Sequence, residues 1–200
     1  DMINKKMIEK KIAIIGLGNP GEKYEKTRHN VGFQLVDHLI KQWNLTKVGK
    51  KCSGIIHKGE KETVSIITLK PTTFMNESGK AVQSLISVYK LKPQACVIIL
   101  DDIDLPLGTL RIREKGSGST HNGLKSVINC LGTKEIPRIK IGIGPQPQDQ
   151  ELSDFVLNNF QSTEQKIIKK VIELTITSIE YRLTHSLENV MAKFNQNILK

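Results

Sequence analysis

The sequence predicts an α/β fold, a single three-layer α/β/α domain with a mixed, largely parallel sheet. Short apolar runs rich in Ile and Val alternate with segments of helical period, and no internal repeat or interdomain linker separates them. With 200 residues, 38% of them hydrophobic, the chain can bury one substantial core, whereas two domains of ordinary size would be cramped. We therefore expect one domain over residues 1–200, with residues 1–10 as an N-terminal extension that is disordered or introduced by cloning.

The first part of the chain is expected to contain one helix between strands. Ile12–Leu17 is a continuous apolar run, which predicts a buried strand, and apolar residues at helical spacing predict a helix from about Asn30 to Trp43. Gly54–His57 and Thr63–Leu69 then flank the polar segment Lys58–Lys61. This pattern predicts a β-hairpin that turns in the polar segment.

The rest of the chain continues the alternation of strands and helices. Gly116–Thr120 and Pro145–Gln150 are rich in residues that favour loops. Between and around them we expect, in order, a helix over Ser78–Tyr89, strands over Cys96–Leu100 and Thr109–Arg113, a helix over Asn122–Leu131, a strand over Arg138–Ile143, and a long helix opened by the capping pair Ser162 and Gln165.

The charge balance favours a polyanionic partner. Thirty Lys and Arg residues against 20 Asp and Glu give a formal net charge of +10 and a pI near 9.5. Nucleic acid is the natural candidate, although a basic surface that only keeps the protein dissolved has the same composition. Only 4% of the residues are aromatic, so contacts with RNA should run through phosphates and shape and not through stacked bases.

The sequence also indicates a soluble, cytoplasmic protein. Cys52, Cys96 and Cys130 are odd in number and far apart, without metal-ligand spacing or the pattern of a secreted disulfide framework. The most apolar segments, Ile12–Leu17 and Val97–Leu100, are too short to cross a bilayer. Asp1 is not an initiator residue, so Met2 or Met7 is the expected natural start.

A glycine-rich segment after the first strand raises the possibility of dinucleotide binding. Gly16–Gly21 satisfies the pattern G-x-G-x-x-G. In dinucleotide-binding proteins the helix opens inside this pattern, whereas here Pro20 and the polar run Glu22–Arg28 delay it. The acidic residue expected about 20 positions on would be Asp37, which falls in the middle of the predicted helix. We therefore do not predict a dinucleotide site.

Polar residues stand where predicted strands pass into loops. Asn19 follows the first strand, Asn76 the third and Asp101 the fourth, while His29 and Asn122 lead into helices from neighbouring loops. The carboxyl ends of parallel strands gather at one edge of an α/β sheet, so these side chains are expected to share a pocket. Each also has a purely structural interpretation, as a turn former, a helix N-cap, a surface loop residue or an ion-pair partner.

Together these residues suit the attack of water on a carbonyl group. His29 is able to take a proton from water near neutral pH, and Asp101 is able to fix its tautomer and stabilise the imidazolium. Asn side chains and backbone amides are able to donate hydrogen bonds to a developing oxyanion. The sequence lacks a G-x-S-x-G elbow, an H-E-x-x-H pair and a cysteine beside a plausible histidine. We therefore expect direct hydrolysis by water, with no metal and no cofactor.

Five segments of the chain, in order, resemble the signatures of the bacterial-type peptidyl-tRNA hydrolase family. The resemblance covers nearly the whole chain from Ile12 onward. The five are Gly16–Gly21 with Tyr24 and Thr27–Gly32, Lys70–Asn76 with Ser78-Gly79, Asp101–Pro106, His121–Lys125, and Arg138–Gly144.

The resemblance implies a monomeric cytoplasmic enzyme that cuts the ester between peptide and tRNA and so recycles tRNA from stalled translation, with no membrane and no obligate protein partner. By the family pattern His29 is the catalytic base and Asp101 its partner. The chain departs from the family at Ser119-Thr120, where many members carry two glycines. The implied substrate-binding residues are Asn19, Tyr24, Phe74, Met75, Asn76 and Asn122, and the implied contacts to tRNA phosphates are Arg111, Arg113 and Lys140.

Two other functions remain open at this point. Some relatives of the family act in RNA processing without hydrolysis, but a pure RNA binder has no need of an oriented base. A deacylase for small esters would have no use for a net charge of +10. Salt separates these classes, because binding to tRNA weakens steeply as salt rises and binding of a small neutral ester does not.

Overall fold

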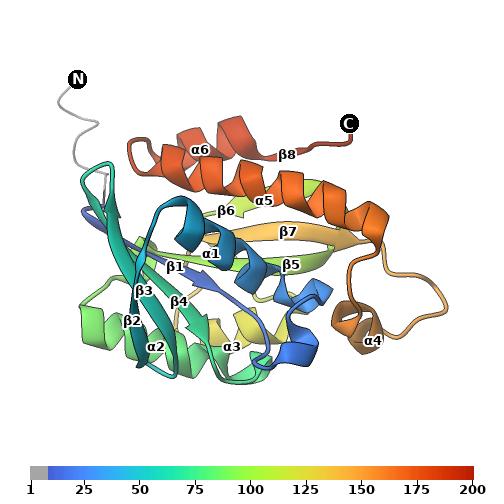
Figure 1. Cartoon of the computed structure of the whole chain (residues 1–200), viewed down its shortest axis with the longest axis horizontal. Helices are drawn as coiled ribbons and strands as arrows, with labels where there is room; N and C mark the ends of the chain where they lie inside the picture. Colours follow the sequence, from blue (N-terminus) through green and yellow to red (C-terminus); the bar gives the residue numbers. More distant parts are fainter. Residues whose placement is uncertain (1–8) are drawn as a thin grey trace.

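The computed structural model describes residues 9–200, so all but the end of the predicted N-terminal extension lies outside the described residues. Its strands form one twisted mixed sheet in the order β2-β3-β4-β1-β5-β7-β6-β8 (Figure 1). The strands are β1 (Lys11–Gly16), β2 (Thr46–Lys51), β3 (Gly54–Lys61), β4 (Val64–Pro71), β5 (Cys96–Pro106), β6 (Thr109–Arg113), β7 (Arg138–Gly144) and β8 (Gln196–Asn197).

Helices cover both faces of the sheet, which confirms the predicted α/β/α architecture (Figure 1). One face carries α1, α5 and α6, and the other carries α2 and α3. The α-helices are α1 (Val31–Gln42), α2 (Ser78–Tyr89), α3 (Asn122–Leu131), α4 (Leu152–Leu157), α5 (Ser162–Arg182) and α6 (Leu187–Phe194), and the short 3-10 turns are η2 (Glu22–Tyr24), η3 (Arg28–Asn30), η4 (Met75–Glu77) and η5 (Pro93–Ala95).

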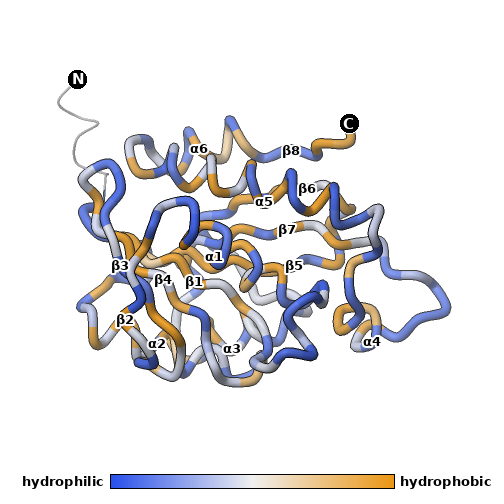
Figure 2. The backbone as a smooth tube through the Cα atoms, viewed as in Figure 1, coloured by the Kyte–Doolittle hydropathy of each residue, from blue (hydrophilic) through white to orange (hydrophobic). Residues whose placement is uncertain are grey.

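The alternation of side chains along the central strands builds two cores. On β1, Ile12 and Ile14 pack beneath α1 and α5, whereas Ala13 and Ile15 pack beneath α2 and α3. Successive side chains of a strand point to opposite faces, so a strand covered on both sides must be apolar throughout. In Figure 2 hydrophobic residues are concentrated along the central strands, whereas hydrophobic and hydrophilic residues alternate along helices such as α5. No helix within residues 9–200 combines the length and apolar character needed to cross a bilayer.

The parallel part of the sheet is confined to its four central strands. β1 pairs in parallel with both β4 and β5, and β5 pairs in parallel with β7, while the outer pairs are antiparallel. The carboxyl ends of β4 and β1 therefore lie at one edge, as the sequence predicts. The predicted end of the next strand at Leu100 is wrong, because β5 continues to Pro106 and Asp101 lies within it. Between β1 and α1 the chain makes the turns η2 and η3 before the helix opens at Val31.

The predicted hairpin exists, but its turn was placed wrongly. β3 runs on through Lys61, and the chain reverses at Glu62-Thr63, whose φ angles of 50° and 66° are both left-handed. Two consecutive left-handed residues form the tight turn that suits the twist of a hairpin. The polar residues Lys58–Lys61, predicted as the turn, belong to the end of a strand that is mostly exposed there.

Other differences have similar physical causes. The cap of α5 is Gln161 with Glu164, one position before the predicted pair Ser162 and Gln165. The edge strand β2 was not predicted, because its lysine-rich residues are nearly all exposed and show no apolar alternation. The short elements α4, α6 and β8 were also missed, because they span too few residues to show a clear period.

Helix α1 lies against the sheet backbone where the chain leaves β1. A Cβ on Gly32 would come within 2.5 Å of the carbonyl oxygen of Ile99 and 2.7 Å of the backbone of Leu17. Only a residue without a side chain permits this approach. Because Gly32 lies just after η3, the approach brings that turn to the carboxyl ends of β1 and β5.

Candidate active site

A pocket of about 350 Å³ opens at the carboxyl edge of the central strands. It contains most of the polar residues that the sequence singled out, together with an apolar wall from α4. The polar lining includes Asn19, His29, Asn76, Asp101, Asp102, His121, Asn122 and Lys140, and the apolar lining includes Phe74, Met75, Ile103, Leu152, Val156 and Leu157.

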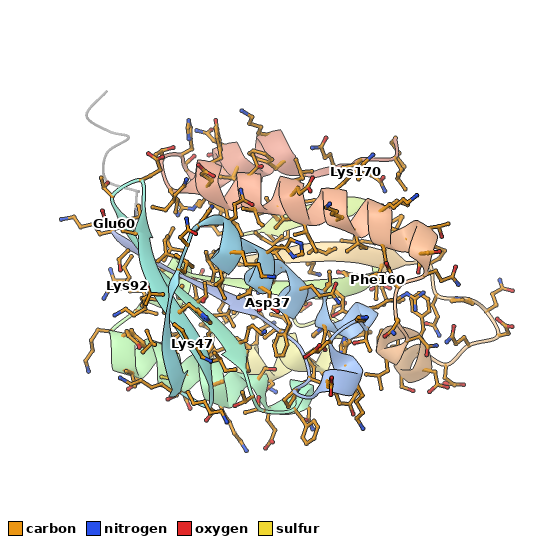
Figure 3. The ribbon with its side chains drawn as sticks, in the orientation of Figure 1. Asp37, Lys47, Glu60, Lys92, Phe160 and Lys170 are labelled. Atoms are coloured by element: carbon orange, nitrogen blue, oxygen red, sulfur yellow. The ribbon has the colours of Figure 1, made fainter. Side chains whose placement is uncertain are left out.

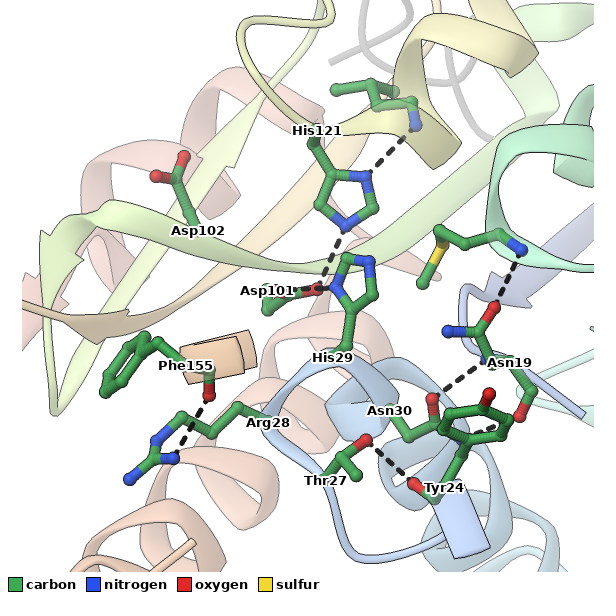
Figure 4. Close-up of polar contacts among 12 residues, drawn as sticks. Asn19, Tyr24, Thr27, Arg28, His29, Asn30, Asp101, Asp102, His121 and Phe155 are labelled. Carbon is green, nitrogen blue, oxygen red and sulfur yellow. Dashed lines mark hydrogen bonds and ion pairs between the residues drawn. The ribbon is translucent and has the colours of Figure 1, made fainter. Parts of the chain in front are cut away.

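A buried carboxylate lies between two histidines, and all three residues line the pocket (Figure 4). Asp101, at the end of the apolar stretch of β5, is only 3% exposed. Its two oxygens each lie 3.0 Å from Nδ1 of His29, and Oδ1 lies 2.9 Å from Nε2 of His121. His29 comes from η3 and His121 is the residue before α3, so the carboxylate joins segments that are far apart in the sequence.

The hydrogen bonds assign a tautomer to each ring. Nδ1 of His121 accepts the backbone N–H of Leu124 at 3.2 Å, so its proton lies on Nε2, which donates to Asp101. His29 donates its Nδ1 proton to the same carboxylate. Nε2 of a neutral His29 is therefore unprotonated and free to accept a proton within the pocket.

The electrostatics of this group favour charged Asp101 and a basic His29. Burial alone would lower the pKa of His29, but the charge of Asp101 and the hydrogen bond to it outweigh burial and raise that pKa above 6.5. Burial opposes ionisation of Asp101, but the two histidines outweigh it and hold the pKa of Asp101 far below 3.8. Asp101 is thus an anion near neutral pH, and His29 is a stronger base than an ordinary histidine.

Two histidines and an aspartate are also ligand types used by transition metals. One ligand atom from each of His29, Asp101 and His121 lies within 4.8 Å of the others. A neutral histidine that binds a metal through Nε2 carries its proton on Nδ1, yet Nδ1 of His121 already faces the N–H of Leu124. These residues therefore fit shared protons better than a metal ion.

Asn19 is held so that its amide group can donate. Its backbone N–H donates to Oδ1 of Asn30 at 2.9 Å, and Nδ2 of Asn30 donates to the carbonyl of Asn19 at 2.9 Å. Oδ1 of Asn19 accepts the backbone N–H of Met75 at 2.8 Å (Figure 4). With its oxygen engaged, Nδ2 has no partner among the described residues and remains available to a ligand.

Asn76 and Asn122 line the pocket as exposed residues at the starts of helices. Neither is the N-cap, because α2 is preceded by Glu77 and α3 by His121. The N-cap interpretation of the two asparagines is therefore wrong, and their side chains are not committed to a helix end. Phe74, which is 58% exposed, and the buried Met75 complete this side of the pocket.

Tyr24 is the one predicted substrate contact that does not line the pocket. It belongs to η2, where its carbonyl accepts the hydroxyl of Thr27 at 2.8 Å. In Figure 4 it lies below Asn19, away from the two histidines. The family resemblance implied that Tyr24 lines the crevice with Phe74 and Met75, but Tyr24 belongs to η2 whereas His29 belongs to η3.

The predicted phosphate contacts lie on one face of β6 and β7. Arg111 is paired with Lys140 across the two strands, and directly paired residues share a face. Leu110 and Ile112 point into the core beneath α5, so Arg111 and Arg113 point to the opposite face. Lys140 reaches the pocket and pairs with Asp102 at 3.0 Å, which places this basic face next to the pocket.

Three residues important to the geometry were not predicted. His121 and Asp102 each stand next to a predicted site residue, and Asn30 follows His29. The position of His121 at a helix start, beside Asn122, was the available signal, but it does not show that the ring reaches Asp101. Asn30 is completely buried, and nothing in the sequence distinguishes it from an ordinary helix cap.

Fold and site together define an α/β protein in which a buried carboxylate orients a histidine base toward an open pocket, an arrangement suited to hydrolysis. Comparison with known proteins narrows this class. The family model described as peptidyl-tRNA hydrolase matches residues 13–200, and the chain belongs to this family.

Individual relatives agree with that assignment along nearly the whole chain. The peptidyl-tRNA hydrolase of Carboxydothermus hydrogenoformans is 44% identical over 183 residues, which are 92% of this chain and 97% of that protein. That of a Sulfurihydrogenibium species is 43% identical over 187 residues, which are 94% of this chain and 98% of that protein. The crystal structure of the peptidyl-tRNA hydrolase from Acinetobacter baumannii matches with a TM-score of 0.89 at 30% identity and covers 95% of this chain and 97% of that one.

Replacing Asp101 should reverse the shift of the His29 pKa. In Asp101→Asn the charge that favours imidazolium is lost while burial remains, so the pKa of His29 should fall from above 6.5 to below it. NMR titration of the ring protons measures this directly. The pKa of His57, which burial and the charge of Lys47 lower, does not depend on Asp101 and should not change. A His29 titration unchanged by the substitution would contradict the electrostatic assignment.

Proposed function

We propose that this chain hydrolyses the ester bond between peptide and tRNA in peptidyl-tRNA, with His29 as general base. The observation that carries the proposal is the unprotonated Nε2 of His29 in the pocket, held in place by Asp101. Family membership supports the reaction class. The biological role that follows is the recycling of tRNA from stalled or aborted translation.

The reaction begins with a water molecule hydrogen-bonded to Nε2 of His29. As the water oxygen attacks the ester carbonyl, His29 takes its proton, and Asp101 stabilises the resulting imidazolium. Collapse of the tetrahedral intermediate breaks the bond to the ribose oxygen of the tRNA. The imidazolium returns its proton to that oxygen, so the histidine is restored after each turnover.

The asparagines supply donors to the peptide and the oxyanion. Nδ2 of Asn19 is fixed by the contacts to Asn30 and Met75, so it donates without having to reorient. Asn76 and Asn122 are exposed in the pocket and are the preferred contacts to substrate and water. Phe74 and Met75 line the crevice on the same side, and a contact from Tyr24 would require the substrate to reach beyond the pocket.

The tRNA would lie across the basic face formed by Arg111, Arg113 and Lys140. This face adjoins the pocket through Lys140, so phosphates bound there would deliver the ester to His29. The net charge of +10 assists the encounter at long range. We propose that the chain acts as a monomeric single domain in the cytoplasm, without a metal or other cofactor.

Removing the base should abolish most of the activity. His29→Ala should slow hydrolysis of an N-blocked aminoacyl-tRNA by about 10²–10⁴-fold, the usual contribution of a positioned general base. The assay follows the release of deacylated tRNA with a chelator present throughout, and circular dichroism checks the fold of the variant. Near-normal turnover in the variant would reject the mechanism, whereas tRNA binding without hydrolysis in the wild type would favour an RNA-binding protein.

Removing one arginine of the basic face should weaken tRNA binding without altering the chemical step. Arg113→Ala is expected to raise the Kd for tRNA. It should also reduce the slope of log affinity against log salt by about one, the contribution of one phosphate contact, while the single-turnover rate constant of hydrolysis stays the same. Lys47→Ala is the matched control, because it removes one positive charge from the opposite edge of the sheet (Figure 3). An equal salt slope in wild type and Arg113→Ala would remove Arg113 from the binding face.

A further inference from the structure

The residue before the proposed base is a buried arginine whose contacts have no part in the mechanism above. Arg28 is only 4% exposed. Its Nη1 donates to the carbonyl of Phe155 at 3.2 Å and that of Asn158 at 3.4 Å, and its Nη2 pairs with Glu164 at 2.8 Å. The guanidinium carbon also lies 4.2 Å from the centre of the Phe155 ring (Figure 4).

These contacts meet at the end of α4, the helix that forms the apolar wall of the pocket. α4 has six residues and follows a loop rich in proline and glutamine. A helix this short has little stability of its own, so its position depends on tertiary contacts. A cation is most favourable near the carbonyl groups at the carboxyl end of a helix. The guanidinium of Arg28 lies at that end of α4.

Glu164 ties the same arginine to the next helix. Its Oε2 accepts the backbone N–H of Gln161 at 2.6 Å and so caps the first turn of α5 while pairing with Arg28. The backbone of Arg28 also donates to the carbonyl of Asn158 at 3.0 Å. One ion pair therefore connects η3, the end of α4 and the start of α5.

Through Arg28, the apolar wall formed by α4 is held at a fixed distance from His29, the proposed base. Leu152, Val156 and Leu157 of α4 line the pocket, as His29 does. Arg28 is covalently next to His29, and its side chain holds the far end of α4. A lysine carries the same charge but has no planar fork, so it cannot serve these carbonyls and Glu164 together.

We propose that Arg28 and Glu164 are positioning residues that hold α4 against η3, so that α4 forms an apolar subsite for the amino-acid side chain next to the scissile ester. The proposal rests on the proposed function for its substrate. In this proposal the ion pair makes the enzyme selective for substrates with a large apolar side chain next to the ester, in addition to any contribution to the stability of the fold.

The test compares two substrates in which N-acetyl-leucine or N-acetyl-glycine is esterified to one and the same tRNA. The wild type, Arg28→Lys and Glu164→Gln are each assayed for kcat/KM on both. Glu164→Gln keeps an oxygen that can cap α5 but removes the charge that faces Arg28. Glu180→Gln is the matched control, because it breaks another ion pair of α5, that with Lys61 at 3.2 Å, without touching α4.

We expect the leucyl-to-glycyl ratio of kcat/KM to fall by about fivefold or more in Arg28→Lys and Glu164→Gln, because contact with an apolar side chain is worth roughly tenfold or more in such pockets. The ratio should not change in Glu180→Gln. Amide hydrogen exchange should become faster over residues 152–157 in the first two variants and stay unchanged in the middle of α5.

An equal loss on both substrates would overturn the proposal, since it would mean that the pair contributes only to stability. Unchanged ratios with unchanged exchange would also overturn it. Failure of the wild type to hydrolyse either ester would instead reject the proposed function. Because hydrogen exchange does not depend on activity, it would still show whether Arg28 and Glu164 hold α4.

Discussion

The geometry of the site depends on one buried carboxylate that accepts hydrogen bonds from two histidines. Burying Asp101 as an anion is costly unless its oxygens are paired, and His29 and His121 supply that pairing. His29 leads into α1 on one face of the sheet, and His121 caps α3 on the other. The carboxylate of Asp101, in the middle of β5, thereby links both helical layers to the sheet at the point where the pocket opens.

The surrounding structure keeps the partners of this carboxylate in place. The absence of a side chain at Gly32 allows α1, and with it His29, to approach the ends of β1 and β5. On the opposite side, buried Arg138 donates to the carbonyls of Ser117, Lys134 and Ile136, which fastens the loop that leads to His121. Within that loop Ser119 adopts a φ of 51°, a left-handed conformation that a glycine would adopt without strain.

Most of the fold and much of the site could be predicted because they follow from local pattern and sheet topology. Doubly covered strands must be apolar, and parallel strands bring Asn19 and Asp101 to one edge. The features that the sequence did not predict depend on contacts between segments that are far apart in the chain. The ring of His121 reaches Asp101, and the guanidinium of Arg28 reaches α4, but neither contact leaves a periodic signal in the sequence. The edge strand β2 was missed for the opposite reason, since exposed lysines resemble a loop.

The central claim is that Asp101 fixes both histidines in complementary tautomers, and ¹⁵N NMR of the imidazole nitrogens tests it most directly. At a pH well above the raised pKa of His29, this ring should carry its one proton on Nδ1, whereas His121 should carry its proton on Nε2 and leave Nδ1 to the N–H of Leu124. That result would leave Nε2 of His29 free to accept a proton from water. A proton found on Nε2 of His29 would contradict the account, because the proposed base would then already be occupied on the side that faces the pocket.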